Sequence, residues 1–197
     1  MRVTGQSAPL VGILIGGLGG AIYWVAVQIW PSSVAVILSM TATALLTAEL
    51  RGVAATRIDV LGRVLCLLIK YNALMALSAA KLPFAAPANI PLALIIICGY
   101  GASFAMLVSV EALRPEKSAR KIGHGALSLA LLIGFVPAAL LGIPGLIGLA
   151  AAIIAGMMII GFLKYKGAAA TGEARDLTQL CTEVCFYLGA LASWAYV

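Results

Sequence analysis

Long apolar runs follow one another along this chain of 197 residues, and they constrain its fold more than any other feature. Most of them reach the roughly 17–25 residues that a helix needs to cross the apolar core of a bilayer. Their apolar residues are continuous rather than alternating, which excludes a transmembrane β-barrel. We therefore predict an all-α fold, a polytopic integral membrane bundle of about seven transmembrane helices that form a single domain, residues 1–197. The predicted spans are Ala8–Ile29, Val34–Leu50, Ile58–Ala80, Ile90–Leu113, Gly125–Leu141, Ile143–Leu163 and Leu177–Val197.

The composition agrees with a membrane protein, because 63% of the residues are hydrophobic and 10% are charged, against about a quarter charged in soluble domains. The net charge is +6, but no Lys/Arg run is long enough for a nucleic-acid arm. Of the 13 lysines and arginines, eleven fall on the same predicted side of the membrane. Lys81 falls on the opposite side, and Lys70 lies within the third span. Since cytoplasmic loops are enriched in these residues, we predict a cytoplasmic N-terminus and an external C-terminus in a bacterial inner membrane.

Polar residues inside apolar spans are the candidates for chemistry, because a bilayer penalises polar groups that have no partner. Lys70 lies about 16 Å along the third span from Asp59, near the bilayer midplane. Glu183 is the one acidic residue predicted at a comparable depth, so one hypothesis pairs Lys70 with Glu183. The alternative is that Lys70 snorkels or lines a wet cavity. Along the polar stretch that leads into the last span, Glu173, Asp176, Gln179 and Glu183 share about one third of the helix circumference.

Two further groups of residues predict contacts rather than catalysis. Gly12, Gly16 and Gly20 repeat every four residues, which favours close helix packing, either within the chain or against another subunit. A basic loop is expected to meet anionic lipid headgroups or a phosphorylated ligand; its cations are Arg114, Lys117, Arg120 and Lys121. The four cysteines are predicted to be buried and reduced, and no His or third Cys is expected near Cys181 and Cys185, so no metal site is predicted there.

Several stretches resemble the cobalamin (5′-phosphate) synthase family, also called adenosylcobinamide-GDP ribazoletransferase. Pro9–Gly20 is similar to the family's Gly-rich first helix, and Leu45–Thr47 is similar to the lead-in to its signature loop. Thr171-Gly172-Glu173, with Glu183 further on, resembles the family's C-terminal motif, and Lys70 lies where the family tends to have a lysine. The resemblance implies a membrane enzyme that joins α-ribazole 5′-phosphate to adenosylcobinamide-GDP with the help of Mg²⁺.

The departures from the family pattern fall on its carboxylate cluster, which resembles His-x-Asp-Gly-x-Ala-Asp-x-x-Asp. Here the corresponding stretch runs from Glu49 to Asp59, and Arg51 and Ala55 stand where the first two aspartates are expected. Such a site should bind Mg²⁺ poorly, because phosphoryl transfer needs carboxylate-held cations over the phosphates.

We therefore expect a catalytically degenerate relative, without a metal or cofactor, that serves as an accessory subunit among other membrane subunits and lipids. The alternative is an active, Mg²⁺-dependent ribazoletransferase, so enzymatic activity stays open. In that alternative the metal-side carboxylates would be Glu49, Asp59, Glu173, Asp176 and Glu183. With or without catalysis, phosphate or lipid is expected to meet Arg51, Arg57, Arg63, Lys70 and the four cations of the basic loop.

Overall fold

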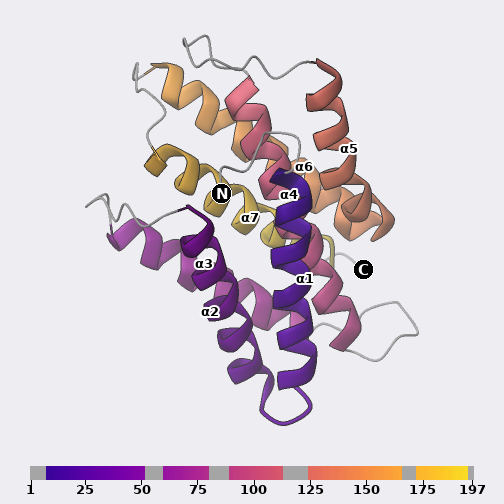
Figure 1. The fold of residues 1–197 in the computed structure, drawn as a ribbon. Coiled ribbons are helices and arrows are strands. Elements are labelled where there is room, and N and C mark those ends of the chain that lie inside the picture. The colour runs from indigo at the N-terminus through magenta and orange to yellow at the C-terminus, as the bar shows by residue number, and fades with distance from the viewer. Residues whose placement is uncertain (1–7, 52–59, 80–88, 113–123, 166–171, 195–197) are drawn as a thin grey trace.

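A computed structural model of the chain describes residues 8–51, 60–79, 89–112, 124–165 and 172–194. These residues form seven α-helices and no strand (Figure 1). The helices are α1 (Ala8–Ala26), α2 (Ser32–Arg51), α3 (Val60–Ala79), α4 (Asn89–Ala112), α5 (His124–Leu140), α6 (Ile143–Tyr165) and α7 (Gly172–Trp194). The predicted all-α class is therefore confirmed for the described part of the chain, whereas the number of membrane crossings and their orientation stay predictions.

The helix boundaries follow local chemistry more closely than hydropathy alone. The first predicted span reaches Ile29, but α1 ends at Ala26, and a turn before Pro31 closes it with the Trp30 amide donating to the Ala26 carbonyl at 2.8 Å. Since proline disfavours a helical residue before it, the early end is expected. In contrast, α7 begins at Gly172, five residues before the predicted Leu177, because its first turns are polar but still helical.

The link between α5 and α6 is a tight turn at the place where the two predicted spans meet. α5 ends at Leu140 and α6 already begins at Ile143, so Leu141 and Gly142 alone connect them. Gly142 has a φ of 74°, a left-handed conformation that glycine adopts without steric cost. The Leu146 amide donates to the Gly142 carbonyl at 3.0 Å, which starts α6 directly after the turn.

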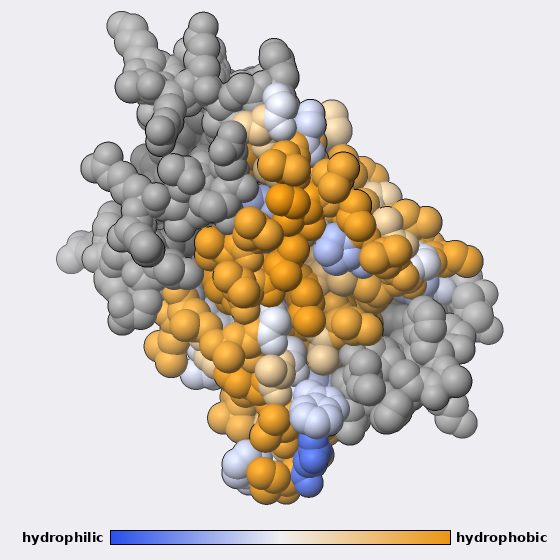
Figure 2. Space-filling view, turned by 45° about the vertical axis from the view of Figure 1, so that its right-hand side comes forward, coloured by the Kyte–Doolittle hydropathy of each residue, from blue (hydrophilic) through white to orange (hydrophobic). Residues whose placement is uncertain are grey.

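Among the described residues, four stretches are long and apolar enough to cross a membrane: Ala8–Ala26, Gly62–Ala79, Leu92–Val110 and Ile143–Phe162. α2 and α5 contain shorter apolar stretches. Large apolar side chains point outward, including Leu14 (72% exposed), Leu140 (80%) and Met158 (71%). Figure 2 shows that hydrophobic residues cover much of the visible face. An apolar exterior of this extent suits lipid rather than water, so the protein is an integral membrane protein.

α4 is the central helix of the bundle, and 78% of its Leu92–Val110 stretch is buried, against 22% of Ile143–Phe162 in α6. It packs against α1, α3, α5, α6 and α7. The predicted glycine repeat of α1 lies against it: a Cβ at Gly12 would come within 2.8 Å of Phe104, and one at Gly20 within 2.9 Å of the Ala93 carbonyl. This face is therefore used for packing inside the chain, the first of the two alternatives, whereas a Cβ at Gly17 would meet no atom within 4 Å.

Candidate functional site: a buried charge pair among α3, α4 and α7

One face of α7 carries polar side chains at Asp176, Gln179, Glu183 and Tyr187, spaced so that each lies one turn from the next. α3 presents Arg63 and Lys70, seven residues apart, toward this face. The exposure of the α7 side chains falls along the helix, from partly exposed Asp176 to buried Gln179, Glu183 and Tyr187. The polar face of α7 therefore leads from the end of the helix into the interior of the bundle.

Lys70 and Glu183 form a direct ion pair in the core, with 2.6 Å between Lys70 Nζ and Glu183 Oε1. Their side chains are 4% and 3% exposed. This confirms the pairing hypothesis and rejects the alternative in which Lys70 snorkels. A charged side chain at the centre of a membrane helix costs about 2.5–3.5 kcal/mol on insertion scales, so each charge here depends on the other.

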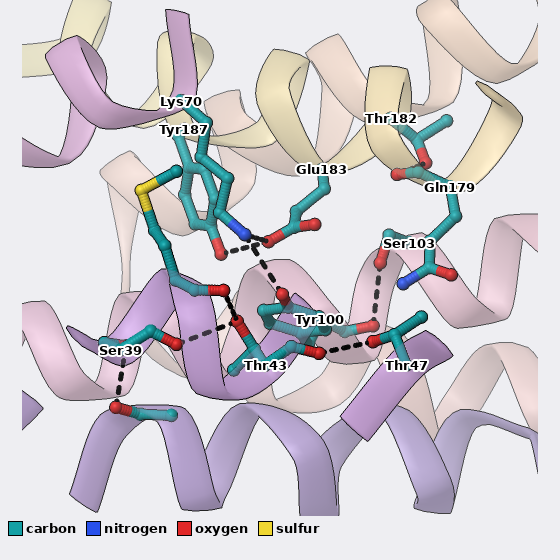
Figure 3. Close-up of polar contacts among 12 residues, drawn as sticks. Ser39, Thr43, Thr47, Lys70, Tyr100, Ser103, Gln179, Thr182, Glu183 and Tyr187 are labelled. Carbon is teal, nitrogen blue, oxygen red and sulfur yellow. Dashed lines mark hydrogen bonds and ion pairs between the residues drawn. The ribbon is translucent and has the colours of Figure 1, made fainter. Parts of the chain in front are cut away.

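Two tyrosines complete the surroundings of this pair (Figure 3). The Tyr187 hydroxyl donates to Glu183 Oε1 at 2.9 Å, and Lys70 Nζ donates to the Tyr100 hydroxyl at 3.0 Å. Lys70 Nζ also lies 4.7 Å from the centroid of the Tyr100 ring and 5.9 Å from that of Tyr187. The ammonium is thus enclosed by a carboxylate, a phenol oxygen and two aromatic faces, which suit a desolvated cation.

The polar contacts continue from Tyr100 toward α1 through α2. Thr43 lies beside Tyr100 and donates to the Ser39 carbonyl at 2.9 Å. Ser39 in turn donates to the Gly19 carbonyl of α1 at 2.8 Å. A line of buried polar groups therefore connects α1, α2, α4, α3 and α7, and it fixes how these five helices meet, because buried hydrogen bonds require defined geometry.

A second ion pair joins the same two helices closer to their N-terminal ends. Arg63 Nη2 lies 3.3 Å from Asp176 Oδ2, and the side chains are 44% and 33% exposed. Asp176 is 113 residues beyond Arg63 (176 − 63), and Glu183 is also 113 beyond Lys70 (183 − 70). The constant offset means that α3 and α7 run in the same direction and in one register, as two odd-numbered spans of the predicted topology would.

Between the two ion pairs lies Gln179, which is 4% exposed. Its Oε1 atom has no hydrogen-bond partner among the described residues. Such an atom costs about 1–3 kcal/mol of desolvation. The polar groups near this level of α4 and α7 are also buried, since Ser103, Thr178 and Thr182 are each 0% exposed.

The cysteines differ from the prediction in their burial and in their neighbours. Cys98 is buried, but Cys66, Cys181 and Cys185 are only partly buried. In addition, Cys66 of α3 lies within hydrogen-bonding range of Cys181, so the expectation of no third cysteine near Cys181 and Cys185 is wrong. The reason is the register of α3 and α7, which hydropathy does not reveal. Within the described ranges, no group of three or more His, Cys, Asp or Glu residues is arranged to hold a metal ion.

Many of the other predicted site residues lie outside what the structure describes. Glu49 and Arg51 fall in the last turn of α2 and Glu173 near the start of α7, without described side chains. Outside the described residues altogether are Arg57, Asp59, Arg114, Lys117, Arg120 and Lys121. The proposed cluster of five carboxylates and the basic phosphate site therefore stay predictions.

The sequence reasoning did not identify Tyr100 and Tyr187 as part of the site. Tyrosines inside apolar runs are common core residues, so neither one stands out alone. A usable signal was the spacing of Tyr187, four residues after Glu183 on the polar face of α7. Tyr100 gives no such signal, because it follows a long apolar run in a helix that is buried on nearly all sides.

The described residues, in sum, belong to an all-helical integral membrane protein with a charge pair closed inside its bundle. In one segment the chain is cobalamin-synthase-like: it is 49% identical over 47 residues to an adenosylcobinamide-GDP ribazoletransferase of Leptothrix cholodnii. This segment covers 24% of the chain and 18% of that relative's length. No family model and no solved structure matches the chain.

Proposed function

We propose that this protein is a catalytically degenerate relative of the cobalamin synthases that acts as an accessory subunit of a larger membrane complex. The observation that carries the proposal is the Lys70–Glu183 pair. In the enzymatic alternative, Glu183 would face a metal ion and Lys70 a phosphate. With 2.6 Å between them and with side chains 4% and 3% exposed, the two charges neutralise one another and present no net charge to either ligand.

The same reasoning applies to the second described acid of that set, Asp176, whose charge is met by Arg63 at 3.3 Å. In the stretch that resembles the family's carboxylate cluster, Arg51 and Ala55 stand in place of aspartates. Mg²⁺ prefers several carboxylate and water oxygens in octahedral geometry, and an arginine adds repulsion there. These residues do not fit a resident Mg²⁺, so no phosphoryl-transfer step is assigned to them.

The close packing of the helices supports a scaffolding role. The glycine contacts between α1 and α4 and the polar line through five helices stabilise a defined bundle independently of any ligand. The short segment that is 49% identical to a ribazoletransferase is the specific observation that favours retained activity, so the experiment must separate the two readings.

The first arm of the experiment is complementation. A strain lacking its synthase, grown under conditions that require cobalamin, receives this chain, the Leptothrix cholodnii transferase as positive control, or the Arg51→Asp/Ala55→Asp variant. We expect growth with the positive control and none with this chain at equal membrane abundance. Growth supported by the unaltered chain would overturn the degenerate reading.

The second arm tests the subunit role in the native organism. The chain is tagged at its own locus, extracted in mild detergent and followed by native electrophoresis and mass spectrometry. We expect co-migration with defined membrane subunits, and we expect their assembly to fall when the gene is deleted. A chain that migrates alone, with no other membrane protein reduced by its deletion, would contradict the accessory role.

A further inference from the structure

The thiols of Cys66 and Cys181 lie next to one another across the interface between α3 and α7, between the two ion pairs. Their side chains are within hydrogen-bonding range of each other. The register agrees with this in height along the helices: with an offset of 113 residues, Cys66 lies level with residue 179. Cys181 is two residues further along α7, about 3 Å along the helix axis.

These thiols are at the outer edge of the interface rather than in the core. Cys66, Cys181 and Cys185 are partly exposed, whereas Cys98 is buried. The stripe of α7 that carries Cys181 continues to exposed Leu177 (44%) and Leu188 (42%), and Leu65 beside Cys66 is 50% exposed. A reagent that reaches this edge must therefore be soluble in the apolar phase.

We propose that Cys66 and Cys181 are a modification site, a pair of thiols that a lipid-soluble disulfide converts into a covalent bridge between α3 and α7. One thiolate attacks the small disulfide, forms a mixed disulfide and releases one small thiol. The second thiolate attacks the mixed disulfide, which forms the Cys66–Cys181 bond and releases the second small thiol. Two protein thiols are oxidised, one disulfide is reduced, and the two protons pass to the leaving thiolates.

The packing favours this bridge over two separate mixed disulfides. A disulfide needs Cα atoms about 4.4–6.8 Å apart, and the Cys66 side chain is a hydrogen-bonding neighbour of the Cys181 thiol. The ion pairs at Arg63–Asp176 and Lys70–Glu183 hold the helices on both sides of the thiol pair. The bridge therefore requires little movement, and it locks the register that the ion pairs already set. This inference is independent of the proposed accessory role.

The test uses the purified chain in lipid nanodiscs and 4,4′-dithiodipyridine, an apolar disulfide whose thione product absorbs light. In a Cys98→Ser/Cys185→Ser background, Cys66 and Cys181 are the remaining cysteines. We expect two thiones released per chain, no pyridyl adduct left on the protein, and a linked peptide that dithiothreitol separates. Adding Cys181→Ser should give one thione and a persistent mixed disulfide on Cys66.

Peptide mapping of the unaltered protein provides the second measurement, which does not depend on the folding of serine variants. We expect the peptides of Cys66 and Cys181 to be linked, with Cys185 carrying at most an adduct. Separate pyridyl adducts on Cys66 and Cys181, or a bridge from Cys66 to Cys185 instead, would overturn the assignment.

Discussion

The two ion pairs between α3 and α7 share one register but lie in different surroundings. Arg63 and Asp176 are 3.3 Å apart with side chains 44% and 33% exposed, whereas Lys70 and Glu183 are 2.6 Å apart and almost fully buried. An exposed pair contributes about 0.2–1 kcal/mol, but breaking a buried pair costs about 3–5 kcal/mol because one charge is left uncompensated. Removing one charge should therefore cost much more stability at Lys70–Glu183 than at Arg63–Asp176.

The largest effect is expected from removing one member of the buried pair. Glu183→Leu leaves the Lys70 ammonium without its carboxylate, and Lys70→Met does the reverse, so each variant should lose about 3–5 kcal/mol of unfolding free energy. The measurement is reversible unfolding by SDS in mixed micelles, followed by circular dichroism.

The control is the Lys70→Met/Glu183→Leu double variant, which removes both charges and should be more stable than either single variant. A double variant whose loss equals the sum of the two single losses would show that the charges are not coupled, and the contrast between the two ion pairs would disappear.

The next largest loss of stability is expected from the tyrosines that surround the buried pair. Tyr187→Phe keeps the ring but removes the hydroxyl that donates to Glu183 at 2.9 Å. Both residues lie in α7, and a hydrogen bond within a protein contributes about 0.5–1.5 kcal/mol net. We expect a loss toward the upper value, because the acceptor is charged, and no further loss when Tyr187→Phe is added to Glu183→Leu. An equal loss in both backgrounds would mean that the hydroxyl stabilises something other than the carboxylate.

The helices and the buried pair were predictable from the sequence for the same physical reason. Apolar runs mark helices that lipid can surround, and a lone charge inside such a run demands a partner at equal depth. Lys70 and Glu183 were the ionisable residues that met this condition. The predicted span began at Leu177 because hydropathy does not count polar turns, but the helical spacing of Glu173 and Asp176 had already placed them on the same helix as Glu183.

The lateral arrangement of the helices could not be predicted. α4 is apolar on all sides, so its sequence does not show which face meets α1 or α7. For the same reason the proximity of Cys66 to Cys181 and the contact of Tyr100 with Lys70 were missed. Both depend on which helices are neighbours, and the repeat of Gly12, Gly16 and Gly20 indicated close packing without indicating the partner helix.

A smaller effect is expected midway between the two ion pairs, at Gln179. Its buried Oε1 has no hydrogen-bond partner in the described part of the chain, so Gln179→Met, which keeps the length without the polar atoms, should raise stability by about 1 kcal/mol. The measurement is the same SDS unfolding midpoint, with Gln179→Ala as a control that also opens a cavity and should destabilise. A loss with Gln179→Met would indicate that the amide satisfies a donor, such as a bound water.

The smallest effect is expected at the exposed pair, where Asp176→Asn should lower stability by less than about 1 kcal/mol. Water and ions screen this pair, so the difference between Asp176→Asn and the unaltered protein should shrink further as NaCl rises from low to about 1 M, where the Debye length is about 3 Å. The matched isosteric variant at the buried end, Glu183→Gln, should lose several times more stability and should not respond to salt. Equal losses at both ends, or a salt response at the buried end, would show that water reaches Lys70 and Glu183, and that burial does not distinguish the two pairs.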